Sequence, residues 1–278
     1  MDALTKAKFI AITIVVFELA YRPAQPEGSA QDLHTQAASA VLARDFNDPD
    51  LSYLLLDEDG QVIAQRWDDL ERDIPVGSLT KPFLAVAYGR THQTFPAFRC
   101  TGKKTCWLPR GHGTLHIREA IALSCNSYFH QLVAGAGRGF GPAMESFELH
   151  ASHGSGEAQS LATASPLALA RAYLELSHHK EEREVRPVLQ GLALSAQKGT
   201  AKAVAAEMPG LPALAKTGTA PCTHAKKAPG DGFAVVMAPA EHPRAVLLVR
   251  VHGKPGFIAA GLAGRMLAEV ESSGAPSK

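Results

Sequence analysis

A serine followed three residues later by a lysine is the first pattern in this sequence that could carry out covalent catalysis. Ser78 and Lys81 lie in the stretch VGSLTKPFLAVAY, where an apolar run begins. A serine hydroxyl becomes a strong nucleophile when a base accepts its proton, and a lysine can be that base if its neutral form is populated. A helix cap followed by a solvated lysine would look the same, so the four-residue pattern alone leaves both interpretations open.

Position in the chain favours one serine–lysine pair over two competitors. The chain contains three such pairs: Ser78/Lys81, Ser177/Lys180 and Ser195/Lys198. About one is expected by chance in a chain of this length. Only Ser78 opens a helix after a predicted hairpin, from about residue 78 to 88 and closed by Gly89. A helix N-terminus offers free backbone N–H groups and favours negative charge, as an oxyanion intermediate requires.

A second polar group, Ser124-Cys125-Asn126, interrupts an apolar helical pattern. Polar groups in such a setting need partners. Ser124 could relay a proton between Lys81 and a leaving group, and Asn126 could bind a substrate amide. A plain helix-ending turn would look the same.

A third group, Lys216-Thr217-Gly218-Thr219, ends a strand-like run. An edge strand here could pair its backbone with an extended peptide, and Gly218 would permit close approach. Lys216 and Thr217 could bind a carboxylate. Alone, a strand that ends in Thr-Gly is a weak signal.

The patterns S-x-x-K, S-x-N and K-T-G occur in this order, and the last two occur once each. In this respect the sequence resembles the penicillin-binding proteins and serine β-lactamases, which use this set for acyl transfer. The resemblance covers nearly all of residues 35–275. It includes the segments GHGTLHIREAIALSCNSYF and DGFAVVMAP.

The resemblance implies a role for each motif residue. Ser78 would be the acylated nucleophile and Lys81 its general base, and the backbone N–H groups of Ser78 and Thr219 would form the oxyanion hole. The other motif residues would act in proton transfer and substrate binding: Ser124, Asn126, Lys216, Thr217 and Gly218. No cofactor and no metal is implied.

The elements that must position these residues change along the chain. A hairpin, SYLLLD and QVIAQRW around EDG, precedes a helical middle, and three strand-like runs and a final helix follow. This order predicts an α/β fold with an inserted helical lobe. The resemblance implies a β-lactamase/transpeptidase-like fold, with a five-stranded antiparallel sheet flanked by helices, an inserted all-helical lobe and the site between them.

The N-terminus indicates export. A basic start, MDALTKAK, is followed by the short apolar stretch FIAITIVVFELA, which is typical of a signal peptide. We expect residues 1–30 to be a signal peptide or N-terminal anchor, and residues 31–278 to be the transpeptidase-like domain. The domain would be periplasmic or at the cell surface, and would meet the inner membrane only if the segment is retained. With a net charge of +1 and no basic stripe, nucleic acid is not expected as a partner.

The cysteines fit an exported protein. Cys100 and Cys106 flank the loop RCTGKKTCW and would form a small-loop disulfide in an oxidising compartment. A zinc site needs four well-spaced ligands, and no second cysteine pair appears, although His112 and His130 are near in sequence. The other two cysteines are isolated in sequence and are expected to be small buried residues: Cys125 and Cys222.

The expected function is acyl transfer on cell-wall peptides. The resemblance implies a D,D-transpeptidase or D,D-carboxypeptidase that acts on D-Ala-D-Ala stem peptides of peptidoglycan and is covalently inhibited by β-lactams. A serine β-lactamase and a non-catalytic sensor or wall-binding module are the alternatives. The Glu-x-x-Leu-Asn loop of one lactamase branch is absent, and Glu157 is the nearest substitute, although a solvated loop carboxylate explains it better. The sequence indicates no particular protein partner.

Overall fold

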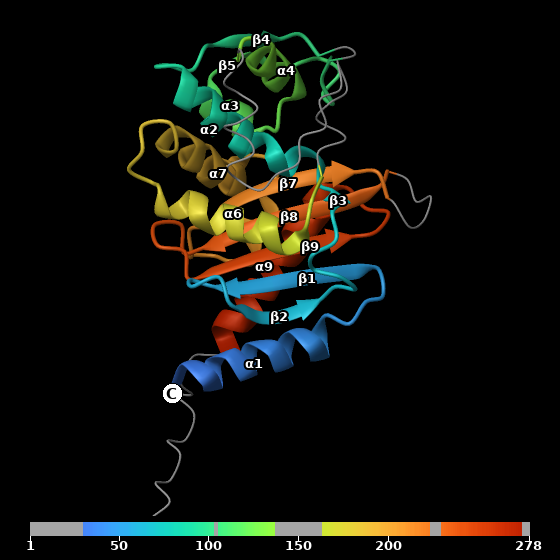
Figure 1. Ribbon diagram of the computed structural model, residues 1–278. Coiled ribbons are helices and arrows are strands. Elements are labelled where there is room, and N and C mark those ends of the chain that lie inside the picture. Colours follow the sequence, from blue (N-terminus) through green and yellow to red (C-terminus); the bar gives the residue numbers. More distant parts are fainter. Residues whose placement is uncertain (1–29, 103–104, 137–162, 223–228, 274–278) are drawn as a thin grey trace, which may run out of the picture.

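A five-stranded sheet forms the centre of the molecule (Figure 1). The computed structural model describes residues 30–102, 105–136, 163–222 and 229–273. The strands, in spatial order, are β2 (Val62–Arg66), β1 (Leu51–Asp57), β9 (Ala245–Val251), β8 (Asp231–Ala238) and β7 (Leu214–Ala220). Every neighbouring pair is antiparallel. The expected sheet is therefore confirmed, and β7 with the third motif is its terminal strand.

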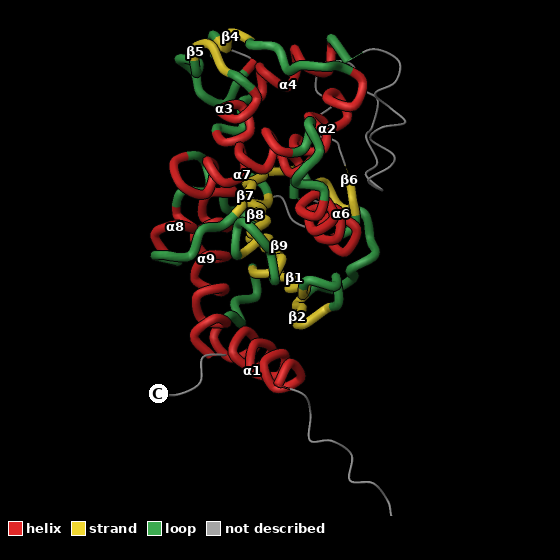
Figure 2. Tube along the Cα trace, turned by 90° about the vertical axis from the view of Figure 1, so that its left-hand side faces the viewer, coloured by secondary structure: helices red, strands yellow, loops and turns green. Residues whose placement is uncertain are grey.

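Helices cover both faces of this sheet, as Figure 2 shows with the sheet nearly edge-on. The helices that pack on the sheet are α1 (Ala30–Asp45) and α9 (Gly256–Ser273) on one face and α6 (Pro166–His178) on the other, and α8 (Ala203–Glu207) packs against α9. Side chains of β1 alternate accordingly, with Tyr53 and Leu55 in one core and Leu54 and Leu56 in the other. Burial on both faces explains why this strand is a continuous apolar run rather than an alternating one.

A smaller lobe lies beyond the β7 edge of the sheet (Figure 1). Its helices are α2 (Lys81–Thr91), α3 (Ile117–Ala122) and α4 (Asn126–Ala134), and α7 (Arg186–Lys198) packs between α3 and β7. Two short ladders complete the described fold: β4 (Phe98–Cys100) with β5 (Gly113–Leu115), and β3 (Ile74–Pro75) with β6 (Thr163–Ala164). The expected inserted helical lobe is present, and the β4–β5 ladder is an addition that the sequence did not indicate.

The predicted leader lies outside the described residues, apart from Ala30, which begins α1. Among the residues that the structure describes, no helix combines the length and the apolar character needed to cross a membrane.

Helix α2, which begins with Lys81, continues past the predicted stop at Gly89 and ends at Thr91. Gly89 is needed for packing rather than for termination. A Cβ at this position would lie 2.4 Å from the Cβ of Glu184 in the loop before α7. The absence of a side chain therefore lets that loop lie directly against the helix.

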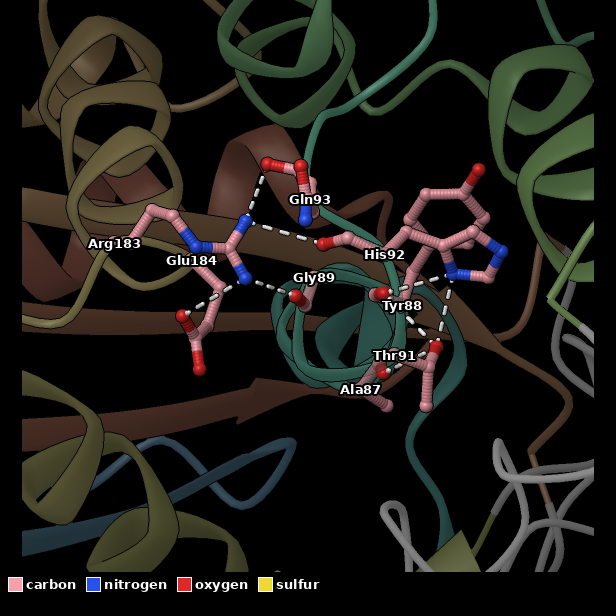
Figure 3. A network of polar contacts seen from close by, with 8 residues as sticks. All are labelled: Ala87, Tyr88, Gly89, Thr91, His92, Gln93, Arg183 and Glu184. Carbon is pink, nitrogen blue, oxygen red and sulfur yellow. Dashed lines mark hydrogen bonds and ion pairs between the residues drawn. The ribbon is translucent and has the colours of Figure 1, made fainter.

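Arg183, in the loop between α6 and α7, binds the C-terminal end of α2 (Figure 3). Its guanidinium donates to the carbonyl oxygens of Gly89 at 2.7 Å, of His92 at 3.1 Å and of Gln93. The last carbonyls of a helix lack intrahelical donors and carry partial negative charge, so a cation here satisfies both needs. This contact fixes the far end of the helix whose first residue is Lys81.

Replacing Arg183 with Ala should lower the free energy of unfolding by about 1–2 kcal/mol, since three carbonyl oxygens lose a charged donor that is partly exposed. Urea unfolding followed by circular dichroism measures this. Arg186→Ala is the matched control, because Arg186 is exposed and its one partner among the described residues is Glu181, and it should change the value by less than about 0.5 kcal/mol. Equal effects of the two substitutions would contradict the assignment.

Candidate active site

The turn that carries Ser78 is pressed against strand β7. It forms a short 3-10 helix, Gly77–Thr80, that leads directly into α2. Gly77 has φ +54°, and a Cβ there would lie 2.5 Å from the carbonyl oxygen of Thr219. Only glycine meets both the left-handed conformation and the close approach. The first motif and the third are therefore adjacent because the residue before Ser78 has no side chain.

Ser124 occupies a strained turn between α3 and α4. Its φ of 50° is unusual for a residue with a Cβ and costs about 1–3 kcal/mol. Backbone hydrogen bonds hold the turn, from Ser124 N to Ile121 O at 3.1 Å and from Cys125 N to Ala120 O at 3.0 Å. The predicted break of the helical pattern is thus confirmed, and its backbone is more strained than a simple helix end.

Lys81 is fully buried, and its ammonium contacts the second motif at three points. Nζ lies 2.8 Å from Ser124 O, 2.6 Å from Asn126 Oδ1 and 3.3 Å from Ser124 Oγ. Burial lowers the pKa of Lys81 to about 7, against the opposing effect of the thiols of Cys125 and Cys106. A neutral amine is therefore available near neutral pH, as a general base requires.

Lys216 reaches the same hydroxyl from the sheet. Its Nζ lies 2.8 Å from Ser124 Oγ and 2.8 Å from Thr217 O, and the side chain is fully buried. Burial, and then the charge of Lys81, hold the pKa of Lys216 well below its ordinary value. A single hydroxyl thus joins two buried amines, and one charged lysine can donate to Ser124 while Ser124 donates to a neutral one.

The three motifs meet in one pocket of about 700 Å³. Six of the eight predicted motif residues line it: Ser78, Ser124, Asn126, Thr217, Gly218 and Thr219. Lys81 and Lys216 are buried behind Ser124. Within the described part of the chain, no hydrogen bond joins Ser78 to Lys81. The arrangement places Ser78, the hydroxyl of Ser124 and two amines of lowered pKa in one part of the structure.

The serines of the two competing serine–lysine pairs are buried in helices and do not line the pocket. Ser177 is buried and donates to Leu174 O at 2.6 Å, one turn back in α6. Ser195 is fully buried within α7. Lys198 does line the pocket, although its partner serine does not.

Sequence reasoning missed Thr200, which links the third motif to the second. Thr217 Oγ1 donates to Thr200 Oγ1 at 2.6 Å, and Thr200 N donates to Ala122 O at 3.0 Å, at the end of α3. Trp107 and Phe257 also line the pocket and are more than half exposed. Nothing in the run KGT at residues 198–200 marks its threonine as a link to the third motif.

The expected disulfide between Cys100 and Cys106 is not formed in this structure, where both residues are thiols. The two sulfur atoms instead face one imidazole, and His112 Nδ1 lies 3.6 Å from Cys100 Sγ and 3.5 Å from Cys106 Sγ. Cys125 is buried as expected but is not isolated in space, since its Sγ lies 3.9 Å from Cys106 Sγ.

Comparison with known proteins identifies the fold through solved structures and not through sequence. No protein-family profile and no curated protein matches this sequence. Solved structures do match. A chain from a peptidoglycan synthase complex superposes with a TM-score of 0.65 and 17% identity, covering 88% of this chain and 59% of that chain.

Two further matches come from named bacteria. The transpeptidase domain of the FtsI4 D,D-transpeptidase from Legionella pneumophila has a TM-score of 0.60 and 18% identity, covering 87% of this chain and 96% of that one. Pseudomonas aeruginosa PBP2, in complex with WCK 5153, has a TM-score of 0.69 and 18% identity, covering 86% and 76%. The protein therefore has the fold of penicillin-binding protein transpeptidase domains, and the resemblance stated from the motifs is confirmed at the level of fold.

The shifted pKa of Lys81 can be measured directly by NMR of protein labelled with ¹³C at the lysine Cε. One lysine signal should titrate near pH 7, protonated below and neutral above, because burial disfavours the charged form. Exposed lysines should titrate above about pH 10.

The variant Lys81→Arg serves as the assignment control, since arginine keeps the positive charge and removes the lysine signal. The signal that titrates near neutrality should vanish in this variant. If every lysine signal of the wild-type protein titrated together at the ordinary value, the assignment of a neutral Lys81 would be wrong.

Proposed function

We propose that the protein is a serine acyltransferase that acts on peptidoglycan stem peptides ending in D-Ala-D-Ala, as a D,D-transpeptidase or D,D-carboxypeptidase, and binds penicillin at Ser78. The observation that carries the proposal is the shared hydroxyl of Ser124, which contacts both Lys81 and Lys216 beside the pocket that Ser78 lines. Acyl transfer needs a nucleophile, a base of near-neutral pKa and a route for the proton, and these residues can supply all three.

Acylation would proceed in two proton-transfer steps. Ser78 Oγ attacks the carbonyl carbon of the penultimate D-Ala while neutral Lys81 accepts the hydroxyl proton. The oxyanion is held by the backbone N–H groups of Ser78 and Thr219. The C–N bond to the terminal D-Ala then breaks, and the departing amine takes a proton from Ser124, which regains one from Lys81. The ester on Ser78 remains for an acceptor amine or water.

Substrate binding would use the terminal strand of the sheet. Strand β7 pairs with β8 on one side, so an extended peptide could add along its other edge, beside the pocket. Thr217 and the charged form of Lys216 would attract the substrate carboxylate. Asn126 would donate its side-chain N–H₂ to a substrate carbonyl, since its Oδ1 already accepts from Lys81.

The lining of the pocket favours a slowly hydrolysed acyl-enzyme over a β-lactamase. None of the described residues that line it is Asp or Glu, so none of these residues is a carboxylate that could activate water. Glu157, the substitute considered from the sequence, lies outside the described residues. With residues 1–30 as a leader or anchor and residues 31–278 as the acting domain, the enzyme would work in the periplasm or at the cell surface, where peptidoglycan is found.

Incubation with penicillin, followed by intact-mass and peptide mass spectrometry over time, tests the proposal. One adduct should form on Ser78 and persist for many minutes. A peptide ending in D-Ala-D-Ala should release free D-Ala. Ser78→Ala should abolish both, and Lys81→Ala should slow acylation by about a hundredfold or more, since a general base contributes 10²–10⁴-fold.

Ser177→Ala and Ser195→Ala are the matched controls, because each removes the serine of a competing pair, and both should acylate like the wild type. An adduct that disappears within seconds, with rapid turnover of the antibiotic, would favour the β-lactamase. A stable adduct without D-Ala release would favour the sensor, and an adduct on another serine would overturn the assignment.

A further inference from the structure

Four side chains with metal-binding atoms gather beneath the second motif. Cys100 ends β4, Cys106 and His112 belong to the connection from β4 to β5, and Cys125 lies between α3 and α4. Their sulfur and nitrogen atoms all lie within 4.8 Å of one another. The three cysteines are at least nine-tenths buried. Residues distant in sequence thus place four ligand atoms around one point.

The spacing of these atoms is that of a zinc coordination shell. With Zn–S bonds of about 2.3 Å and Zn–N bonds of about 2.0 Å, tetrahedral ligands lie about 3.8 Å apart for two sulfurs and about 3.5 Å apart for sulfur and nitrogen. Cys106 Sγ lies 3.9 Å from Cys125 Sγ. His112 Nδ1 lies 3.5 Å from Cys106 Sγ and 3.6 Å from Cys100 Sγ. No ligand would have to move far to bind the ion.

The loop backbone is folded to bring the ligands together. Gly102 and Gly111 both have φ +74°. A Cβ on Gly102 would lie 2.2 Å from Pro109 O, and one on Gly111 would lie 2.4 Å from Cys100 O. Glycine is therefore needed twice for the loop to close on itself. These close approaches bring Cys100 and His112 near each other, with Cys100 Sγ 3.6 Å from His112 Nδ1.

We propose that Cys100, Cys106, His112 and Cys125 bind one Zn²⁺ ion as a closed structural site. Three thiolates and one imidazole are soft to intermediate ligands, which select zinc over magnesium or calcium. Four protein ligands leave no open position, as in structural rather than catalytic zinc sites. The expectation of no metal rested on the missing second cysteine pair, and Cys125 with His112 takes the place of that pair.

The ion would act on the active site through Cys125. This residue lies between Ser124 and Asn126, both of which contact Lys81 Nζ. Ser124 also holds a strained positive φ. Zinc bound to Cys125 would tie the strained turn to the β4–β5 loop and so hold the Ser124 hydroxyl between the two lysines. The four ligands are therefore positioning residues and take no part in the reaction itself.

Metal analysis of the full-length protein, purified under reducing conditions and dialysed against metal-free buffer, tests the proposal without reference to activity. About one zinc per chain should be retained, and Cys106→Ser and His112→Ala should retain nearly none. Replacing zinc with Co²⁺ should give intense visible bands of a tetrahedral site and near-ultraviolet thiolate absorption in the wild type.

Two variants separate loss of the site from loss of folding. His112→Cys keeps a tetrahedral ligand set and should retain the metal, whereas Ser177→Ala, in helix α6, changes no proposed ligand and should leave the zinc content unchanged. A metal-free, folded wild type that fails to take up zinc would overturn the proposal. The proposal would also be overturned if the protein prepared without reductant contained no zinc and had a mass two hydrogens lower than the reduced protein. That result would indicate a disulfide between Cys100 and Cys106.

The active-site consequence is measured separately. Penicillin acylation of Ser78 should slow at least tenfold when zinc is removed and recover when it is restored. Retained zinc with no acylation at all would contradict the proposed function and leave the metal site intact. Zinc loss with unchanged acylation would overturn the positioning role.

Discussion

One hydroxyl shared by two buried lysines is the constraint on which the rest of the site depends. Ser124 Oγ lies 3.3 Å from Lys81 Nζ and 2.8 Å from Lys216 Nζ, and both amines are fully buried. Two ammonium groups this close cannot both stay charged without water, so burial and repulsion drive at least one to the neutral form. The fold thereby lowers the pKa of buried lysines behind a pocket whose described lining contains no histidine and no carboxylate.

The two lobes meet at this hydroxyl because each contributes one lysine. The backbone is closely packed at Gly77 and strained at Ser124. Lys216 comes from the terminal strand of the sheet, and Lys81 comes from the first turn of the helix that Arg183 holds at its other end. Gly77 lets the turn that carries Ser78 lie against β7, and Ser124, at a positive φ, contacts both lysines through its hydroxyl. Such strain is tolerated where surrounding contacts fix the conformation, as the backbone bonds of this turn and the proposed zinc would do.

Sequence patterns predicted the parts of the fold whose signals are local. The β1 and β8 runs are continuous and apolar because both faces are covered, and the helix start at Ser78 and the break at Ser124 are marked by residue type. Contacts distant in sequence were not predictable. Thr200 joins Thr217 to α3 only in three dimensions, and Cys125 looked isolated because its sulfur neighbours lie across the lobe. Helix α1 was not predicted from the sequence, because its residues do not form a marked apolar stripe along one helix face.

The central claim is that Ser78, Ser124 and the third motif act on one carbonyl group, and a crystal structure of the penicillin-treated protein tests it most directly. The account predicts an ester between Ser78 Oγ and the antibiotic's carbonyl carbon. The carbonyl oxygen of this ester should accept hydrogen bonds at about 2.7–3.1 Å from the backbone N–H groups of Ser78 and Thr219. The antibiotic's carboxylate should lie against Thr217. An ester whose carbonyl oxygen points away from Thr219, or a covalent bond to any other side chain, would contradict it.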